Sequence, residues 1–196
     1  MHPSFTEQLQ PHYAAAVHYC RALCARSPAA EADDVLQDAL LKAVEHYDRL
    51  RDPERFKPWL FQIITRTFYS AQRRSYWRRF LPFSEVPEVE QMPSVYRGEA
   101  DRLLIVQALA RLSDRQRTAL LLYEMAGFSV EEIAQIQGDR SRSAVKSRLS
   151  RARHTLRQTI DALEQGHSPA RHSSDDTTDL DYETLTLVAA LDRRTA

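Results

Sequence analysis

A proline-bearing segment near the middle of the chain sets the firmest limit on its fold. Residues 81–99 contain Pro82, Pro87 and Pro93, and a continuous helix does not pass through three such positions. Before Tyr96 the same segment holds three glutamates and no lysine or arginine. The chain of 196 residues has only four glycines and few alternating apolar runs. We therefore predict an all-α protein in which two small helical domains are joined by an extended acidic linker.

The first predicted domain spans residues 1–80. Cys20 and Cys24 stand four residues apart on one side of its N-terminal helix. A metal site would need three or four converging ligands, so we interpret this pair as free thiols in the core, and we expect no metal or other cofactor. Helices are expected over residues 11–27, 30–50 and 58–79.

The second predicted domain spans residues 100–160 and carries the local signals of a helix-turn-helix. Ser113 with Gln116, and Ser129 with Glu132, each match the capping box that opens a helix. A glycine follows each of the two helices and is placed to end it. Helices are expected over residues 99–112, 113–125 and 129–138, and from residue 139 onward.

A C-terminal extension, residues 161–196, is polar and is predicted to be largely disordered. Near its end, Leu185, Val188 and Leu191 have the spacing of a short amphipathic helix. The acids between residues 175 and 183 leave three interpretations open. They mask a basic surface, they dock a regulator, or they are simply solvated.

The last helix of the second domain concentrates positive charge. Net charge is zero over the whole chain, yet residues 140–157 hold seven Lys or Arg and no acid. Val145 begins an apolar stripe at helical spacing, and serines lie on the opposite side among the cations. Long cations bind phosphates and guanine edges, while serine hydroxyls bond to either. This pattern favours a DNA-binding helix over the alternative, a solvated basic face.

A second basic segment, residues 65–80, holds five arginines and no acid, with aromatic residues between them. Exposed aromatic rings stack on unpaired bases while arginines follow the backbone phosphates. The alternative is that rings such as Phe68 are core and the arginines are merely solvated. Two basic surfaces on one chain are unusual for a simple DNA-binding dimer.

Other functional classes find little support in the sequence. No apolar run approaches the roughly 18 residues of a membrane span, and the N-terminus lacks the pattern of a secretory signal, so a cytoplasmic location is predicted. We find no clustered carboxylates, no P-loop and no nucleophile beside a base, so no enzymatic activity is expected.

The order of three motifs resembles the extracytoplasmic-function (ECF) sigma factors of bacterial RNA polymerase, within the sigma-70 family. The motifs are EADDVLQDALLKAVEHYDRL, RFKPWLFQIITRTFYSAQRR, and LSDRQRTALLLYEMAGFSVEEIAQIQG with AVKSRLSRARHTLR. The resemblance implies sigma two-like and sigma four-like domains. It also implies binding to core RNA polymerase and to promoter DNA, promoter-specific initiation in response to stress or an envelope signal, and control by an anti-sigma factor.

The resemblance also assigns residues to each contact. The core-polymerase contact falls on Asp34, Gln37 and Asp38, which share one helix face. The −10 DNA contact falls on Arg66, Thr67, Ser70, Arg73 and Arg74. The −35 DNA contact falls on Arg142, Ser143, Lys146, Ser147, Arg148 and Arg151.

The chain departs from the family pattern at two places. Thr67 and Ser70 stand where Asn and Asp are usual, so the −10 preference cannot be copied from relatives. The turn GDRSRSAVKSR is one residue longer than usual and lacks a second glycine, so Ser141 or Ser143 is expected to cap the helix that follows. Two alternatives to a sigma factor are a helix-turn-helix regulator that acts without polymerase and a sigma-like decoy.

Overall fold

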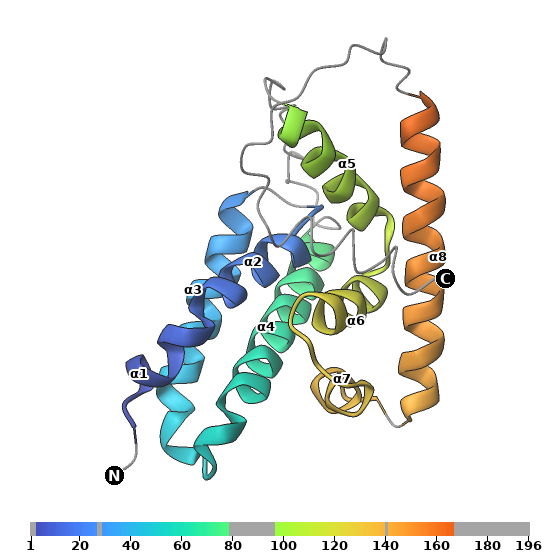
Figure 1. Cartoon of the computed structure of the whole chain (residues 1–196). Coiled ribbons are helices and arrows are strands. Elements are labelled where there is room, and N and C mark those ends of the chain that lie inside the picture. The colour runs from blue at the N-terminus through green and yellow to red at the C-terminus, as the bar shows by residue number, and fades with distance from the viewer. Residues whose placement is uncertain (1–2, 27–28, 79–96, 140, 167–196) are drawn as a thin grey trace.

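The computed structural model describes residues 3–26, 29–78, 97–139 and 141–166. Within these ranges every regular element is a helix, which confirms the all-α class (Figure 1). The acidic linker before residue 97 and the extension after residue 166 lie outside the described residues, and so do the interpretations that concern them.

The first lobe comprises the described residues up to 78. Ser4 and Glu7 form a capping box that opens α1, a helix that the sequence analysis did not predict. Short 3₁₀ turns connect the longer helices, and one of them, Pro53–Arg55, begins where Asp52 caps the Glu54 backbone N–H. The helices are α1 (Phe5–Leu9), α2 (Tyr13–Leu23), α3 (Ala29–His46) and α4 (Phe56–Arg78).

The second lobe comprises the described residues from 97 onward. Both predicted capping boxes are formed, at Ser113 for α6 and at Ser129 for α7. Gly138 ends α7 with φ +67°, a backbone conformation that side chains with a Cβ rarely adopt. The helices are α5 (Arg97–Arg111), α6 (Asp114–Glu124), α7 (Val130–Gln137) and α8 (Arg142–Gly166), the last running beyond the predicted limit at 160.

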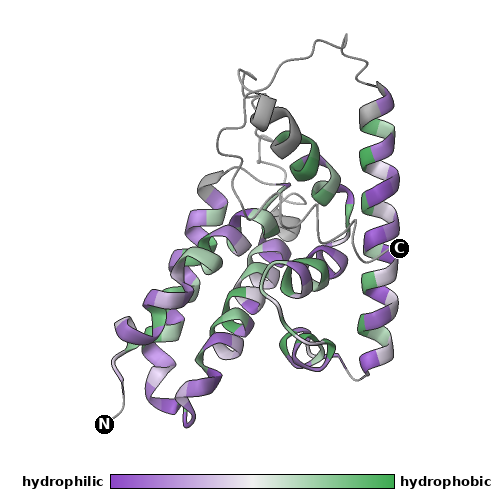
Figure 2. Ribbon diagram, in the orientation of Figure 1, coloured by the Kyte–Doolittle hydropathy of each residue, from purple (hydrophilic) through white to green (hydrophobic). Residues whose placement is uncertain are grey.

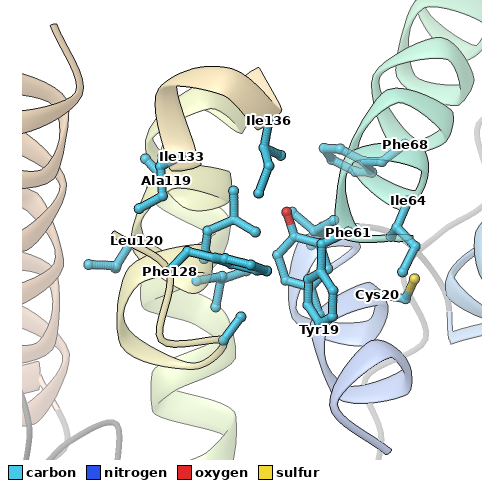
Figure 3. Close-up of a cluster of buried hydrophobic side chains, with 14 of the residues drawn as sticks. Tyr19, Cys20, Phe61, Ile64, Phe68, Ala119, Leu120, Phe128, Ile133 and Ile136 are labelled. Atoms are coloured by element: carbon cyan, nitrogen blue, oxygen red, sulfur yellow. The ribbon is translucent and has the colours of Figure 1, made fainter. Parts of the chain in front are cut away.

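The two lobes pack against each other along α2 and α4 of the first and α6 and α7 of the second (Figure 1). The apolar sides of the helices face inward, and the polar sides face solvent (Figure 2). Phe61 and Phe128 meet edge to face across the boundary with ring centroids 5.3 Å apart. Figure 3 shows Ile136 of α7 beside Phe68 of α4 in the same cluster. One hydrophobic core therefore runs through both lobes.

Polar contacts reinforce this boundary. The Lys57 ammonium donates to the Ala126 carbonyl at 2.6 Å and lies 5.0 Å from the centre of the Phe128 ring. Arg117 of α6 is fully buried, and its guanidinium lies 5.9 Å from the Phe68 ring centre. Burial lowers the pKa of Arg117, and the nearby Asp114 partly restores it. The lobes are thus held by directed contacts as well as by apolar packing.

The two cysteines lie in the core, as predicted. Cys20 is 1% and Cys24 is 3% exposed, and neither forms a disulfide. Burial raises the pKa of the Cys24 thiol to about 12, and it also raises the pKa of Cys20. Both sulfurs therefore remain protonated at neutral pH, which a metal-binding or nucleophilic thiol does not.

Candidate nucleic-acid interface

The outer face of α3 carries the residues assigned to polymerase. Asp34, Gln37 and Asp38 are all exposed on this helix. Helical spacing of three and four residues puts them on the same side, as the sequence analysis required. This face presents two carboxylates and an amide to solvent, so its chemistry suits a basic partner surface.

An apolar groove lies beside this face, and sequence reasoning did not identify it. It runs between α2 and α3, and Gln37 is among its lining residues. Leu41 is 57% exposed, Val44 is 55% exposed and Tyr13 is 48% exposed. Residues 35–44 of α3 carry an apolar stripe at helical spacing that includes Val44, yet the structure leaves this side chain in solvent. Leu41, which falls outside that stripe, was the signal for a second apolar face.

The basic face of α4 is formed by Arg66, Arg73 and Arg74, all exposed. Ser70 is half-buried and accepts a hydrogen bond from Arg73 at 3.2 Å. Among the described residues, no carboxylate lies within ion-pair distance of Arg66 or Arg73. Arg74 approaches Asp38 of α3 at 3.8 Å. The α4 cations are therefore largely unrestrained, and they adjoin the acidic face of α3.

Thr67, which the resemblance assigns to the −10 contact, is buried, unlike the arginines of α4. It is 2% exposed, and its hydroxyl accepts a hydrogen bond from Lys42 of α3 at 3.3 Å. Thr67 lies on the same side of α4 as Ile64 and Phe68, which are both core residues. This side of the helix faces α3, so Thr67 is covered. In this structure Thr67 packs between α4 and α3, and its assignment to the −10 element stays a prediction.

The aromatic residues of the second basic segment divide in the same way. Phe68 is fully buried, so the core interpretation is confirmed for this ring. Tyr69 is half-buried, and its hydroxyl accepts a hydrogen bond from Gln137 of α7 at 3.3 Å. Burial raises the pKa of Tyr69. These two rings therefore contribute to packing between the lobes in this arrangement.

The helix-turn-helix is formed by α7, the turn after it, and α8. Ser141 caps α8, because its hydroxyl accepts a hydrogen bond from the Ala144 backbone N–H at 3.2 Å. Of the two predicted caps, Ser141 is thus the correct one, and Ser143 bonds to it side chain to side chain at 2.9 Å. The apolar stripe of α8 is buried as predicted, with Val145, Leu149, Ala152 and Leu156 at 3% exposure or less.

Acids from α6, α7 and the turn pair with three arginines of α8, although α8 itself has no acid before Asp161. Arg142 pairs with Glu131 of α7, and this guanidinium lowers the pKa of the Glu131 carboxyl. Arg153 donates two hydrogen bonds to Glu124 of α6, at 2.6 and 3.0 Å. Arg148 pairs with Asp139 in the turn. Tertiary packing therefore supplies the counter-charges that the local sequence lacks.

The residues assigned to the −35 element consequently fall into two groups. Arg148 has a side chain only 13% exposed, and it also donates to the Gln137 side-chain carbonyl. It lies next to the buried stripe of α8. The others are exposed, and together they form one continuous surface of hydroxyls and cations. This exposed surface, the α8 face, comprises Arg142, Ser143, Lys146, Ser147 and Arg151.

Two other kinds of site are absent from the described ranges. Nowhere in them do three or more His, Cys, Asp or Glu side chains gather as metal ligands. No helix within these ranges is long and apolar enough to cross a membrane.

Comparison with known proteins agrees with this geometry. Residues 9–78 match the family model described as Sigma-70 region 2, and residues 102–156 match Sigma-70, region 4. The chain is 33% identical over 153 residues to the ECF RNA polymerase sigma factor SigL of Mycobacterium tuberculosis, which covers 76% of this chain and 85% of the relative.

Two further proteins extend the comparison. The ECF RNA polymerase sigma factor EcfG of Rhodopseudomonas palustris is 32% identical over 156 residues, 77% of this chain and 84% of the relative. The sigma factor RpoE of Bartonella quintana, solved in complex with the anti-sigma factor NepR, superimposes with a TM-score of 0.69 at 32% identity. That match covers 80% of this chain and 96% of RpoE.

Proposed function

The chain belongs to the ECF sigma factors of the sigma-70 family, and on this premise we propose that it binds core RNA polymerase and directs it to promoters. It acts as a specificity subunit and not as a catalyst. The observation that carries the proposal is the presence of three distinct surfaces on a chain that matches both sigma regions: the acidic α3 face, the basic α4 face and the α8 face.

Core polymerase docks on the α3 face and on the groove beside it. Gln37 belongs to both, since it lines the groove and lies between Asp34 and Asp38 on the helix. Exposed apolar clusters rimmed by polar residues are typical of protein-protein interfaces. Leu41 and Val44 therefore supply the apolar contact, while the carboxylates orient a basic partner and exclude an acidic one.

The two basic surfaces divide the promoter between them. Arg66 and Arg73 on α4 contact the −10 strand, where unrestrained cations adapt to single-stranded DNA. The α8 face contacts the −35 duplex through its serines and cations, placed as a recognition helix requires. Ser70 remains beside Arg73 at the edge of the α4 contact.

Simultaneous contact with both elements requires the lobes to separate. Tyr69 of α4 accepts from Gln137, and Gln137 in turn accepts from Arg148 of α8. The −10 and −35 elements lie about 25 base pairs apart, on the order of 85 Å of duplex at 3.4 Å per base pair. Helices linked through one glutamine do not span that distance, so the packed arrangement is the one adopted away from the promoter.

The comparison with RpoE also supports a proposal about how this chain is regulated. The solved RpoE was bound to an anti-sigma factor. We infer that this chain is likewise released by a stress or envelope signal from an anti-sigma partner, and that it works in the cytoplasm, where polymerase and promoters are found.

The decisive experiment mixes the purified chain with core polymerase and fragmented genomic DNA, then maps run-off transcripts. A sigma factor gives discrete start sites that share one upstream sequence and that disappear without the chain. Absence of both a core complex and specific initiation contradicts the proposal. A footprint on a palindromic site without polymerase identifies the chain as an ordinary regulator instead.

A further inference from the structure

The turn between α7 and α8 contains a carboxylate that is nearly enclosed by protein. The Asp139 side chain is 9% exposed. Its backbone N–H donates to the Ala134 carbonyl at 2.8 Å, just after the left-handed Gly138. The main chain therefore fixes where this carboxylate lies, before any side-chain partner is considered.

Two guanidinium groups from different helices converge on Asp139. Arg115, in the first turn of α6, donates to one carboxylate oxygen at 3.1 Å. Arg148 of α8 donates to both oxygens, with one of these bonds at 3.1 Å. Gln137 completes the cluster, since it accepts from Arg148 and donates to the Arg115 carbonyl at 3.0 Å. One acid thus ties α6, the turn and α8 together.

The charges explain why this arrangement needs an acid. Arg115 and Arg148 bind the same carboxylate, so their like charges would repel if that carboxylate were neutral. Hydrogen bonds between ions are short and directional, and a nearly enclosed acid is little screened by salt. The Asp139 carboxylate therefore joins the buried apolar stripe and the Ser141 cap among the contacts that place α8 against α6.

We propose that Asp139 is a positioning residue for recognition of duplex DNA. Its ion pair with Arg148 fixes α8 against the turn, and this position of the helix orients the α8 face toward the major groove. Arg148 itself makes no DNA contact. This inference rests on the proposed function, because it requires α8 to meet the −35 duplex.

The test uses the full chain with core polymerase on a promoter identified by run-off transcription. Complex formation is compared between that promoter and the same DNA with a scrambled −35 element, at several salt concentrations. Asp139→Asn preserves the shape and removes the charge. We expect discrimination between the two DNAs to fall about tenfold, the size of an ordinary coupling within one network. Asp139→Glu restores the charge and recovers part of the loss.

The variant Arg148→Gln distinguishes an internal, positioning role of Arg148 from a direct contact with a DNA phosphate. If Arg148 has only an internal role, its loss leaves the salt dependence of DNA binding unchanged. Loss of a phosphate contact lowers the slope of this dependence by about one. The double variant Asp139→Asn/Arg148→Gln should discriminate no worse than Asp139→Asn alone. Lys146→Ala is the matched control on the same helix, and its slope should fall.

Four results overturn the proposal. A lower slope for Arg148→Gln makes Arg148 a DNA contact that Asp139 merely masks. Unchanged discrimination for Asp139→Asn, or equal losses on both DNAs together with a lower melting temperature, reduces Asp139 to a structural role. If the unaltered chain forms complexes but does not discriminate, the −35 assignment of α8 fails as well, and this outcome is visible before any variant is made.

Discussion

The two basic surfaces of this molecule hold their arginines in opposite ways. On α4, Arg66 and Arg73 have no carboxylate partner among the described residues, and the Arg74 pair with Asp38 is loose, with both side chains more than half exposed. On α8, Arg142, Arg148 and Arg153 are each paired with an acid from a neighbouring element.

This difference corresponds to the targets that we propose. Duplex DNA has a regular groove, so a helix whose position is fixed in advance by such ion pairs loses less conformational entropy on binding, as does the paired Arg142 of the α8 face. A melted strand has no fixed shape, and free cations can follow it. A chain that must do both therefore gains from one preset and one adaptable surface.

Glu124→Ala should have the largest effect, because it removes the acid from a well-enclosed pair. The Glu124 side chain is 2% exposed and the Arg153 side chain 32%. Removing one member of a buried pair costs about 3–5 kcal/mol, and the partial exposure of Arg153 reduces this to about 2 kcal/mol of unfolding free energy. Denaturant titration measures it. The control Asp38→Ala should cost about 0.5 kcal/mol or less, and equal losses would abolish the contrast between the surfaces.

Gln137→Ala tests the residue through which the two surfaces are linked. Its side chain bonds to Tyr69, the Arg115 carbonyl and Arg148, and the residue is 7% exposed. Losing these hydrogen bonds should lower stability by about 1–2 kcal/mol. Gln135→Ala is the matched control on α7, since its exposed side chain should be dispensable. A null effect at Gln137 would mean that this residue does not contribute to the packing of the two lobes, which the Lys57 contact and the apolar core would then hold.

Arg73→Ala should leave stability unchanged and weaken binding to a single-stranded −10 oligonucleotide by the polymerase complex. Losing one phosphate contact on a single strand lowers the salt slope by about 0.7. Arg21→Ala, an exposed arginine on α2, serves as the control and should not alter the slope. If Arg73→Ala lowers the melting temperature instead, the α4 cations are structural and the comparison reverses.

The smallest effect is expected at the exposed Glu131–Arg142 pair. Arg142 lowers the pKa of Glu131 in the folded chain below its ordinary value of 4.5. A depressed folded pKa contributes stability above the unfolded value, and this contribution is lost as pH falls through the folded value. Glu131→Gln should therefore melt slightly below the unaltered chain near neutral pH, and the difference should vanish in acid. A difference that persists well below pH 4.5 would exclude the charge as its cause.

Local signals in the sequence were enough for the helices from α2 onward and for the frame of the helix-turn-helix, although α1 was missed. The capping boxes at Ser113 and Ser129 depend on residues three apart, so the sequence shows them directly. The buried stripe of α8 follows from helical spacing. Even the unusual turn led to the right cap among two, at Ser141.

Tertiary relations explain what sequence reasoning missed. The acids that pair with α8 come from α6, α7 and the turn, so no window of α8 contains them. Thr67 is buried because α3 packs over that side of α4. The groove at Leu41 and Val44 appears only when α2 and α3 are placed together. Packing between the lobes likewise joins residues some seventy positions apart, such as Phe61 and Phe128.

The buried thiols make the opening of the two lobes measurable through their chemical reactivity. The charges of Arg117 and Asp114 on α6 act on the pKa of Cys24. This thiol therefore lies close to the boundary between the lobes. A protonated, enclosed thiol does not react with an alkylating reagent until the structure opens around it. The rate of alkylation therefore counts opening events without any introduced label. If core polymerase holds the lobes apart, adding it should raise the rate of alkylation.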